Sequence, residues 1–240
     1  MTRPLALVAA SLLVLGLAGC TPTGPVPTPA TESATPDQPN ESPSPEPTGP
    51  PAVADLQLTT EGLGTLQLGG ALPAADDDTS MIVFDPEFCT DERTGTPAGI
   101  ELGSNAAGLW IPAEQYRTEE GGGYVRAPFG VGIWDDAVQR IEIEDESLTT
   151  DGGITLGSTA ADIAAAYETV ELVPEGLVTL HVVNGTAGKL VFEVATEDES
   201  LPGYWEPDML GTVVLARALA ADEELFAAAG SGNVVNSCPA

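Results

Sequence analysis

The side chains that most often perform catalysis are scarce in this chain. His181 is its only histidine and lies within an apolar run typical of a strand. A hydrolase triad needs an activated nucleophile and an acid that orients the histidine, and no such pattern accompanies His181. One histidine also supplies too few nitrogen ligands for a typical zinc site. We therefore predict no catalytic residue, no metal site and no cofactor. A hydrolase built on His181 is the least favoured alternative.

Acidic side chains are abundant, and their clusters could attract a cation. The clusters are Asp76–Asp78, Glu119–Glu120, Glu144–Glu146 and Glu197–Glu199. Calcium takes about six to eight oxygen ligands, and none of these runs has the ligand spacing of a calcium-binding hand. We expect solvated turns. A cation site assembled from separate loops is the alternative.

Aromatic residues provide the clearest candidate for a binding surface. Tyr204 and Trp205 are adjacent and lie between Pro202 and Pro207. Exposed aromatics in such loops make good contacts with proteins or carbohydrates. The sequence predicts a binding face made of Tyr204, Trp205, Trp110 and Trp134. The alternative is that the tryptophans pack in the core.

The N-terminus has the pattern of an export signal that ends in a cysteine. An apolar run from Leu5 to Gly19 follows Arg3 and is shorter than the ~20 residues that span a bilayer. The sequence Leu17-Ala18-Gly19-Cys20 resembles the lipobox of bacterial lipoproteins. This resemblance implies a signal peptide over residues 1–19, acylation of Cys20 and anchoring on the extracytoplasmic face of the cell membrane. A plain secreted protein is the alternative.

The segment 20–52 is predicted to be a disordered tether. It contains eleven of the 21 prolines, together with many Thr, Ser and Glu residues and no aromatic residue. Such a composition cannot bury enough apolar area to fold. At ~3.1 Å per residue it would reach about 100 Å from the membrane. Pro/Thr/Ser stalks behind a lipobox resemble the envelope lipoproteins of actinobacteria.

The charge balance excludes one class of partner. Without Arg3, the chain has six basic residues and 37 acidic ones, so the mature net charge is 6 − 37 = −31. A surface of this charge repels phosphate backbones, and we exclude nucleic acid as a partner. The charge itself is explained most simply by solubility.

Two cysteines remain once Cys20 is assigned to lipid. Thiols outside the cytoplasm are expected to oxidise, so we predict a disulfide between Cys89 and Cys238. The alternative is two buried free thiols.

An internal similarity indicates a tandem duplication. Residues 58–70 (LTTEGLGTLQLGG) resemble residues 148–158 (LTTDGGITLGS), and each copy predicts a turn followed by a short strand. The predicted units are 53–147 and 148–240. Two alternatives are one continuous domain, 53–240, and a chance similarity of two strand-turn pieces.

Periodicity predicts an α+β fold, with a helix and antiparallel strands in each unit. In the second unit Thr159 and Asp162 can cap a helix running to about Glu171, before Pro174. Strands are expected at 177–183 and 189–195, joined as a hairpin, and at 211–217, with a short helix at 222–229 and a last strand at 233–235. The first unit offers a helix after Pro73, an apolar run at 81–84 and a strand at 139–144.

Two sets of side chains are expected to point into the core from these strands. They are Ile141 and Ile143 in one strand, and Leu190, Phe192 and Val194 on one face of another.

The second unit also resembles a known repeat. Gly-Ile-Thr-Leu-Gly-Ser-Thr at 153–159, a helix with Tyr167 and two strands are similar to the repeat of beta-lactamase inhibitory proteins and of small lipoproteins of outer-membrane assembly. The resemblance implies a helix packed on an antiparallel sheet and a chain that binds another protein. It covers the second half only and implies no binding residues.

Together these features predict a lipid-anchored, non-enzymatic extracytoplasmic domain that binds another envelope protein. The alternative is a lipoprotein that captures a cation or a carbohydrate.

Overall fold

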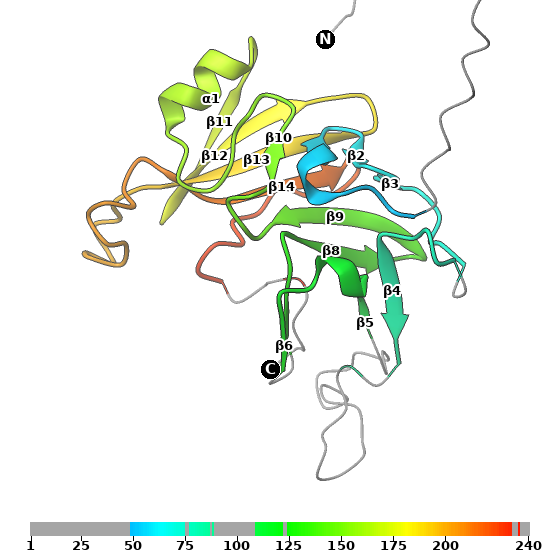
Figure 1. Ribbon diagram of the computed structural model, residues 1–240. Helices are drawn as coiled ribbons and strands as arrows, with labels where there is room; N and C mark the ends of the chain where they lie inside the picture. Colours follow the sequence, from blue (N-terminus) through cyan, green and yellow to red (C-terminus); the bar gives the residue numbers. More distant parts are fainter. Residues whose placement is uncertain are drawn as a thin grey trace, which may run out of the picture. The chain divides into compact units, whose positions relative to one another are not determined.

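The computed structural model describes residues 49–74, 77–86, 88, 109–121, 124–231 and 235, and it is mostly β (Figure 1). The predicted signal peptide, Cys20, Cys89 and Cys238 lie outside the described residues. The strands of the first half are β1 (Gln57–Thr59), β2 (Gly62–Leu63), β3 (Leu66–Gln67), β4 (Ile82–Asp85), β5 (Leu109–Pro112), β6 (Glu119–Gly121), β7 (Tyr124–Arg126), β8 (Phe129–Trp134) and β9 (Ala137–Ile143). The second half provides β10 (Thr149–Thr150), α1 (Ala160–Ala166), β11 (Glu171–Glu175), β12 (Val178–Asn184), β13 (Gly188–Ala195) and β14 (Val213–Ala220).

A six-stranded sheet forms the centre of the fold. Its strand order is β11-β12-β13-β14-β9-β8, and every neighbouring pair is antiparallel. The predicted hairpin is confirmed as β12 and β13, and the predicted strands at 139–144 and 211–217 are present as β9 and β14. Strands from both predicted units lie in this sheet, and the division into two units stays a prediction.

The two self-similar segments meet in a small second sheet of order β10-β1-β2-β3. Strands β1 and β10 pair in parallel, with Leu58 opposite Thr150. The first copy forms β1, the predicted turn and then two short strands, β2 and β3, because a second turn at residues 64–65 divides the single strand that its pattern predicts. In the second copy only Thr149–Thr150 is a strand, so the strand expected after its turn is wrong. Two antiparallel pairs, β4 with β5 and β6 with β7, complete the described strands.

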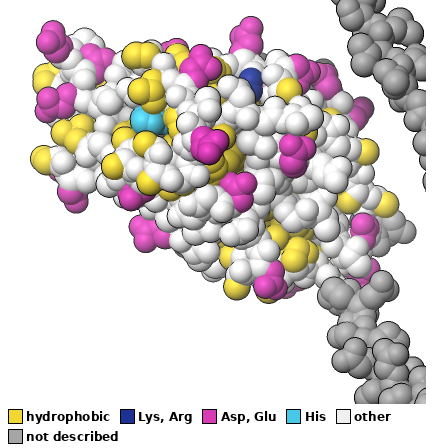
Figure 2. Space-filling model, turned by 90° about the horizontal axis from the view of Figure 1, so that it is seen from above, with side chains coloured by type: hydrophobic (Ala, Val, Ile, Leu, Met, Phe, Trp, Pro, Cys, Tyr) yellow, Lys and Arg dark blue, Asp and Glu magenta, His cyan; other side chains and the backbone are white. Residues whose placement is uncertain are grey.

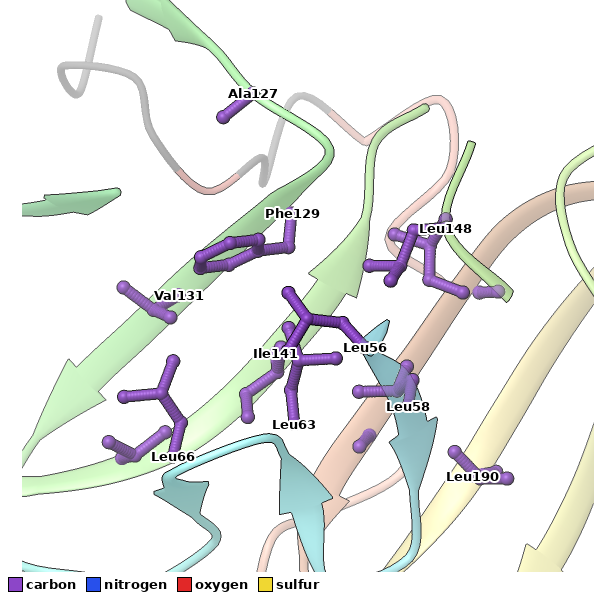
Figure 3. Close-up of a cluster of buried hydrophobic side chains, with 14 of the residues drawn as sticks. Leu56, Leu58, Leu63, Leu66, Ala127, Phe129, Val131, Ile141, Leu148 and Leu190 are labelled. Carbon is purple, nitrogen blue, oxygen red and sulfur yellow. The ribbon is translucent and has the colours of Figure 1, made fainter. Parts of the chain in front are cut away.

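The main core lies between the two sheets. Ile141 and Ile143 from β9, and Leu190, Phe192 and Val194 from β13, are buried in it, as their alternation predicts. Figure 3 shows leucines of the small sheet and of the segment before it facing Phe129, Val131 and Ile141 of the large sheet. Close packing between β13 and β14 requires glycine at position 188, where a Cβ would lie 2.3 Å from the carbonyl oxygen of Leu219.

The opposite face of the large sheet is covered as well. Val178, Leu180 and Val182 of β12, with Val191 and Leu219, form a second, smaller apolar cluster. It is covered by residues that follow β13 and β14: Trp205, Leu225, Ala227 and Ala229. The large sheet is therefore buried on both faces, and this explains the near-continuous apolar runs of β13 and β14.

Helix α1 begins as predicted and ends early. Thr159 caps it, with a reciprocal capping box to Asp162. The helix ends at Ala166 because Tyr167 is extended and its hydroxyl is held by Thr150 at 2.8 Å and Asp151 at 2.9 Å. The expectation of helix up to Glu171 is wrong, since Glu171 begins β11. Pro174 is accommodated in β11 because this strand is at the sheet edge.

The other predicted helices are not present, which corrects the α+β assignment. Among the described residues α1 is the only α-helix. After Pro73, the carboxylate of Asp77 accepts hydrogen bonds from the amide and hydroxyl of Thr79, and this turn replaces the helix. Residues 222–229 form turns and irregular backbone instead of a helix. The predicted last strand, 233–235, lies largely outside the described residues.

Removing the cap of α1 should have a measurable effect. We expect Thr159→Ala to lower the free energy of unfolding by about 1 kcal/mol, because the amide of Asp162 loses its acceptor. Urea unfolding measures this, and Thr169→Ala, the same change at an exposed position after the helix, is the control. Equal urea midpoints for the two variants would contradict the cap.

The capping box also has a pH dependence of known sign. Hydrogen bonds from the side chain and amide of Thr159 lower the pKa of the Asp162 carboxyl. Its contribution to stability is therefore present above the ordinary carboxyl pKa, and it is lost as the pH falls through the lowered folded-state value.

Candidate functional site

The segment between β13 and β14, residues 196–210, carries the predicted aromatic pair and is called the aromatic loop here. Two hydrogen bonds fix it to the start of β12. The amide of Thr196 donates to the carbonyl of Leu177 at 2.9 Å, and the indole Nε1 of Trp205 donates to the same oxygen at 2.7 Å. The Trp205 ring packs against the second apolar cluster. Trp205 thus anchors the loop to the folded sheet.

Tyr204, in contrast, is presented to solvent. Its ring contacts Trp205 edge-on, with 4.9 Å between centroids and 84° between planes. Tyr204 is 46% exposed, and its neighbours Leu201 and Met209 are 50% and 36% exposed. Large apolar side chains at this exposure are uncommon when they gather in one loop, and such groups often mark an interaction site.

A shallow depression lies within this loop. Its lining combines aromatic, aliphatic and acidic residues. They are Thr196, Glu197, Asp198, Leu201, Gly203, Tyr204, Trp205 and Leu210. The lining includes two carboxylates and no basic side chain.

Carboxylates of three predicted acidic clusters form local turns. Asp77, Asp145 and Asp198 each accept the amide of the Ser or Thr two residues further along. Their side chains accept a hydroxyl hydrogen bond as well, and these bonds lower the pKa of each carboxyl. Asp198 is therefore ionised beside the depression at neutral pH. Figure 2 shows the general excess of carboxylates, with magenta side chains scattered over the face in view and very little dark blue.

The other two predicted tryptophans lie in different surroundings. Trp110 of β5 packs against the main core, and its ring is 5.6 Å from that of Phe84. Trp134, at the end of β8, donates from Nε1 to Glu223 at 2.8 Å. The structure thus brings Tyr204 and Trp205 together. It places Trp110 and Trp134 in contacts that do not involve the aromatic loop.

His181 lies on β12, on the face that points toward the main core, and is 9% exposed. Its strand neighbours are Leu172 and Phe192. Burial lowers the pKa of its imidazole, so the ring is neutral at neutral pH. In the described part of the chain no carboxylate or serine hydrogen bond to this imidazole is found.

A buried charge cluster lies on the second face of the large sheet. Arg217 of β14 contacts Glu193 of β13, with 2.9 Å between Nη2 and Oε1, and both side chains are 0% exposed. Arg140 and Glu142 of β9 form a second pair at 3.1 Å. Strand pairing places Glu142 opposite Arg217. Gly132 of β8 leaves room for Arg140, since a Cβ there would lie 3.1 Å from the Cβ of Arg140.

The segment 221–231, which we call the cover segment, is attached through this cluster. Glu193 accepts the amides of Ala228 and Ala229 at 2.8 Å each. Arg217 donates to the carbonyl of Phe226, and its guanidinium lies 4.3 Å from the centroid of the Phe226 ring. At the other end of the segment Lys189 donates to the carbonyl of Glu223 at 2.5 Å. The cover segment is thus held by side chains of the sheet.

Burial perturbs the ionisable groups of this cluster. It raises the pKa of the Glu142 carboxyl, against the opposing attraction of Arg140 and Arg217. It lowers the pKa of Arg217, opposed by Glu193 and Glu142. Two guanidinium groups face two carboxyl groups out of contact with solvent, so the cluster has a structural role in attaching the cover segment.

The buried charge cluster was not among the sites predicted from the sequence. A signal was present, because Glu193 and Arg217 interrupt otherwise apolar strands, and Arg140 and Glu142 have the spacing of two residues on one face. Charged residues at such positions are paired when both faces of a sheet are buried.

The described residues contain no group of three or more His, Cys, Asp or Glu side chains placed to hold a metal ion. In this same part of the chain, no helix has the length and apolar character needed to cross a membrane. Compared with protein families, with curated proteins and with solved structures, the chain has no significant match.

Proposed function

We propose that this chain is a lipid-anchored extracytoplasmic domain that binds another protein of the cell envelope, without enzymatic activity. In this proposal Cys20 carries the lipid, segment 20–52 is the tether, and the aromatic loop makes the contact. The resemblances of the N-terminus to a lipobox and of segment 153–159 to a repeat of protein-binding domains support the same function.

The observation that carries the proposal is the contrast between Tyr204 and Trp205. Trp205 is fixed by a 2.7 Å hydrogen bond and by core packing, while Tyr204 is 46% exposed on top of it. A rigidly mounted, exposed aromatic binds with little loss of side-chain entropy, and Tyr is enriched among residues that dominate interface energies. Leu201 and Met209 extend the apolar surface around it.

Two finer features of the fold belong to this proposal. The first is the disulfide between Cys89 and Cys238, which the oxidising compartment favours. The second is the tandem duplication, supported by the parallel pairing of β1 and β10 from the two similar segments. The candidate face is narrowed to the aromatic loop, because Trp110 and Trp134 contact other parts of the chain.

The alternative function, capture of a cation or a carbohydrate, rests on the same depression, whose lining contains Glu197 and Asp198. Calcium takes roughly six to eight oxygen ligands, whereas this lining supplies two carboxylates, and the described residues contain no group of three or more His, Cys, Asp or Glu side chains placed to hold a metal ion. A contact formed by a protein surface fits this geometry better.

Site-specific photo-crosslinking in cells tests the proposed contact. A benzophenone amino acid in place of Leu201 or Met209 of the full-length, anchored chain should give a discrete adduct with one envelope protein. The control replaces Phe84, which is 44% exposed on β4. We further expect Tyr204→Ala to weaken binding of the crosslinked partner by more than about tenfold. Absence of adducts, or the same adducts from position 84, would contradict the proposal.

A further inference from the structure

We propose that the depression in the aromatic loop receives a single lysine or arginine side chain of the protein partner. This inference rests on the proposed function and names the chemistry of the contact. Two kinds of lining residue support it: the carboxylates of Glu197 and Asp198, and the rings of Tyr204 and Trp205.

Charge complementarity selects a cationic group. Glu197 and Asp198 follow each other in the lining, and the hydrogen bonds from Ser200 keep Asp198 ionised. Four basic side chains are engaged elsewhere: Arg140 and Arg217 in the buried charge cluster, Lys189 on the cover segment and Arg117 on the carbonyl of Pro112. In the described part of the chain no ion pair involves Glu197 or Asp198, and the lining of the depression contains no basic side chain.

The aromatic pair selects a cation with an organic stem. An ammonium or guanidinium group is attracted to the face of an aromatic ring, and the attraction adds to that of a nearby carboxylate. The methylene stem of lysine or arginine can lie along Leu201 and Leu210, which also line the depression. A bare metal ion would gain nothing from these apolar walls. The indole N–H of Trp205 is already bonded to Leu177, so the ring is held in place before binding.

The experiment uses the full-length lipidated chain in non-ionic detergent, with nitrogen-15 in its tryptophans. Each of the three tryptophans gives one indole N–H signal. The Trp205 signal reports on the depression, and the signals of Trp110 and Trp134 serve as internal references. The probes are the Nα-acetyl methylamides of lysine and arginine. The norleucine analogue is the matched uncharged probe, and calcium chloride is the test of a metal ion.

The lysine or arginine probe should shift the Trp205 signal in a saturable way in the millimolar range, while norleucine and calcium leave it unchanged. Glu197→Gln should weaken this binding at least fivefold. Glu171→Gln, the same change at an exposed position on β11, should leave it unchanged. Equal shifts from norleucine, a shift from calcium alone, or no shift of Trp205 with either basic probe would each overturn the inference.

The two proposals fail separately. Crosslinks from positions 201 and 209 together with no response to the basic probes would overturn the cationic contact and leave the protein-binding function standing. A specific response to the probes without any crosslink would support the depression as a cation-binding site and contradict the envelope partner.

Discussion

Glu193→Leu is expected to lower the free energy of unfolding by about 3–5 kcal/mol, because it leaves the fully buried guanidinium of Arg217 without its carboxylate partner. The amides of Ala228 and Ala229 lose their acceptor in the same variant. Denaturant unfolding followed by tryptophan fluorescence measures the change, with Glu171→Leu on the exposed edge strand as the control.

Removing both charges should be less damaging than removing one. The double variant Glu193→Leu, Arg217→Leu leaves no unpaired buried charge, and replacing a buried ion pair by apolar side chains is often close to neutral. We expect it to recover much of the stability lost in Glu193→Leu, although the amides of the cover segment stay without their acceptor. The described pairing would be contradicted if Glu193→Leu lowered the free energy of unfolding by less than about 1 kcal/mol. It would also be contradicted if the loss in the double variant equalled the sum of the losses in Glu193→Leu and Arg217→Leu.

This pair also shows why part of the fold escapes prediction from sequence. In the cover segment Asp222 is followed by two glutamates and then by Leu, Phe and three alanines, a pattern that predicts a helix. In the structure the amides of Ala228 and Ala229 bind Glu193, which is 35 and 36 residues away in the chain. Local propensity cannot include a competing acceptor of this kind, and the same applies to the hydroxyl contacts that end α1 at Ala166.

Features governed by local pattern were predictable. The hairpin of β12 and β13 follows from two alternating apolar runs around a glycine-containing loop. The cap of α1 follows from Thr159 and Asp162 at the spacing of a capping box. The strands that the second half of the chain contributes to the six-stranded sheet could therefore be predicted. Their order in the sheet could not, because it depends on contacts between residues that are distant in the sequence.

The candidate site could also be predicted from the sequence only in part. The adjacency of Tyr204 and Trp205 between two prolines indicated a presented aromatic pair, and the structure places their rings 4.9 Å apart. The sequence does not show which tryptophans pack against the core, so Trp110 and Trp134 were included with Tyr204 and Trp205 in the predicted binding face. The carboxylates beside the pair, Glu197 and Asp198, belonged to a recognised acidic cluster, but only the fold places them in the same depression.

The second large effect is expected at the neighbouring position of β13, on the other face of the sheet. Phe192→Ala should lower the free energy of unfolding by about 3–5 kcal/mol, because Phe192 is 0% exposed within the main core and its removal leaves a cavity. Its ring lies 5.8 Å from that of Tyr167, so the cavity also removes support from the residue that ends α1.

Phe84→Ala is the matched control for this variant. Phe84 is 44% exposed on β4 and contacts Trp110, so the same truncation there should cost less than about 1 kcal/mol. The urea midpoint of Phe192→Ala should fall with little change in the slope of the unfolding transition, since the variant loses packing and not the fold. If the two phenylalanine variants had equal midpoints, the face of β13 that carries Leu190, Phe192 and Val194 would not be the one that packs against the small sheet. The assignment of Glu193 to the opposite face would then be wrong as well, because adjacent residues of a strand point to opposite sides.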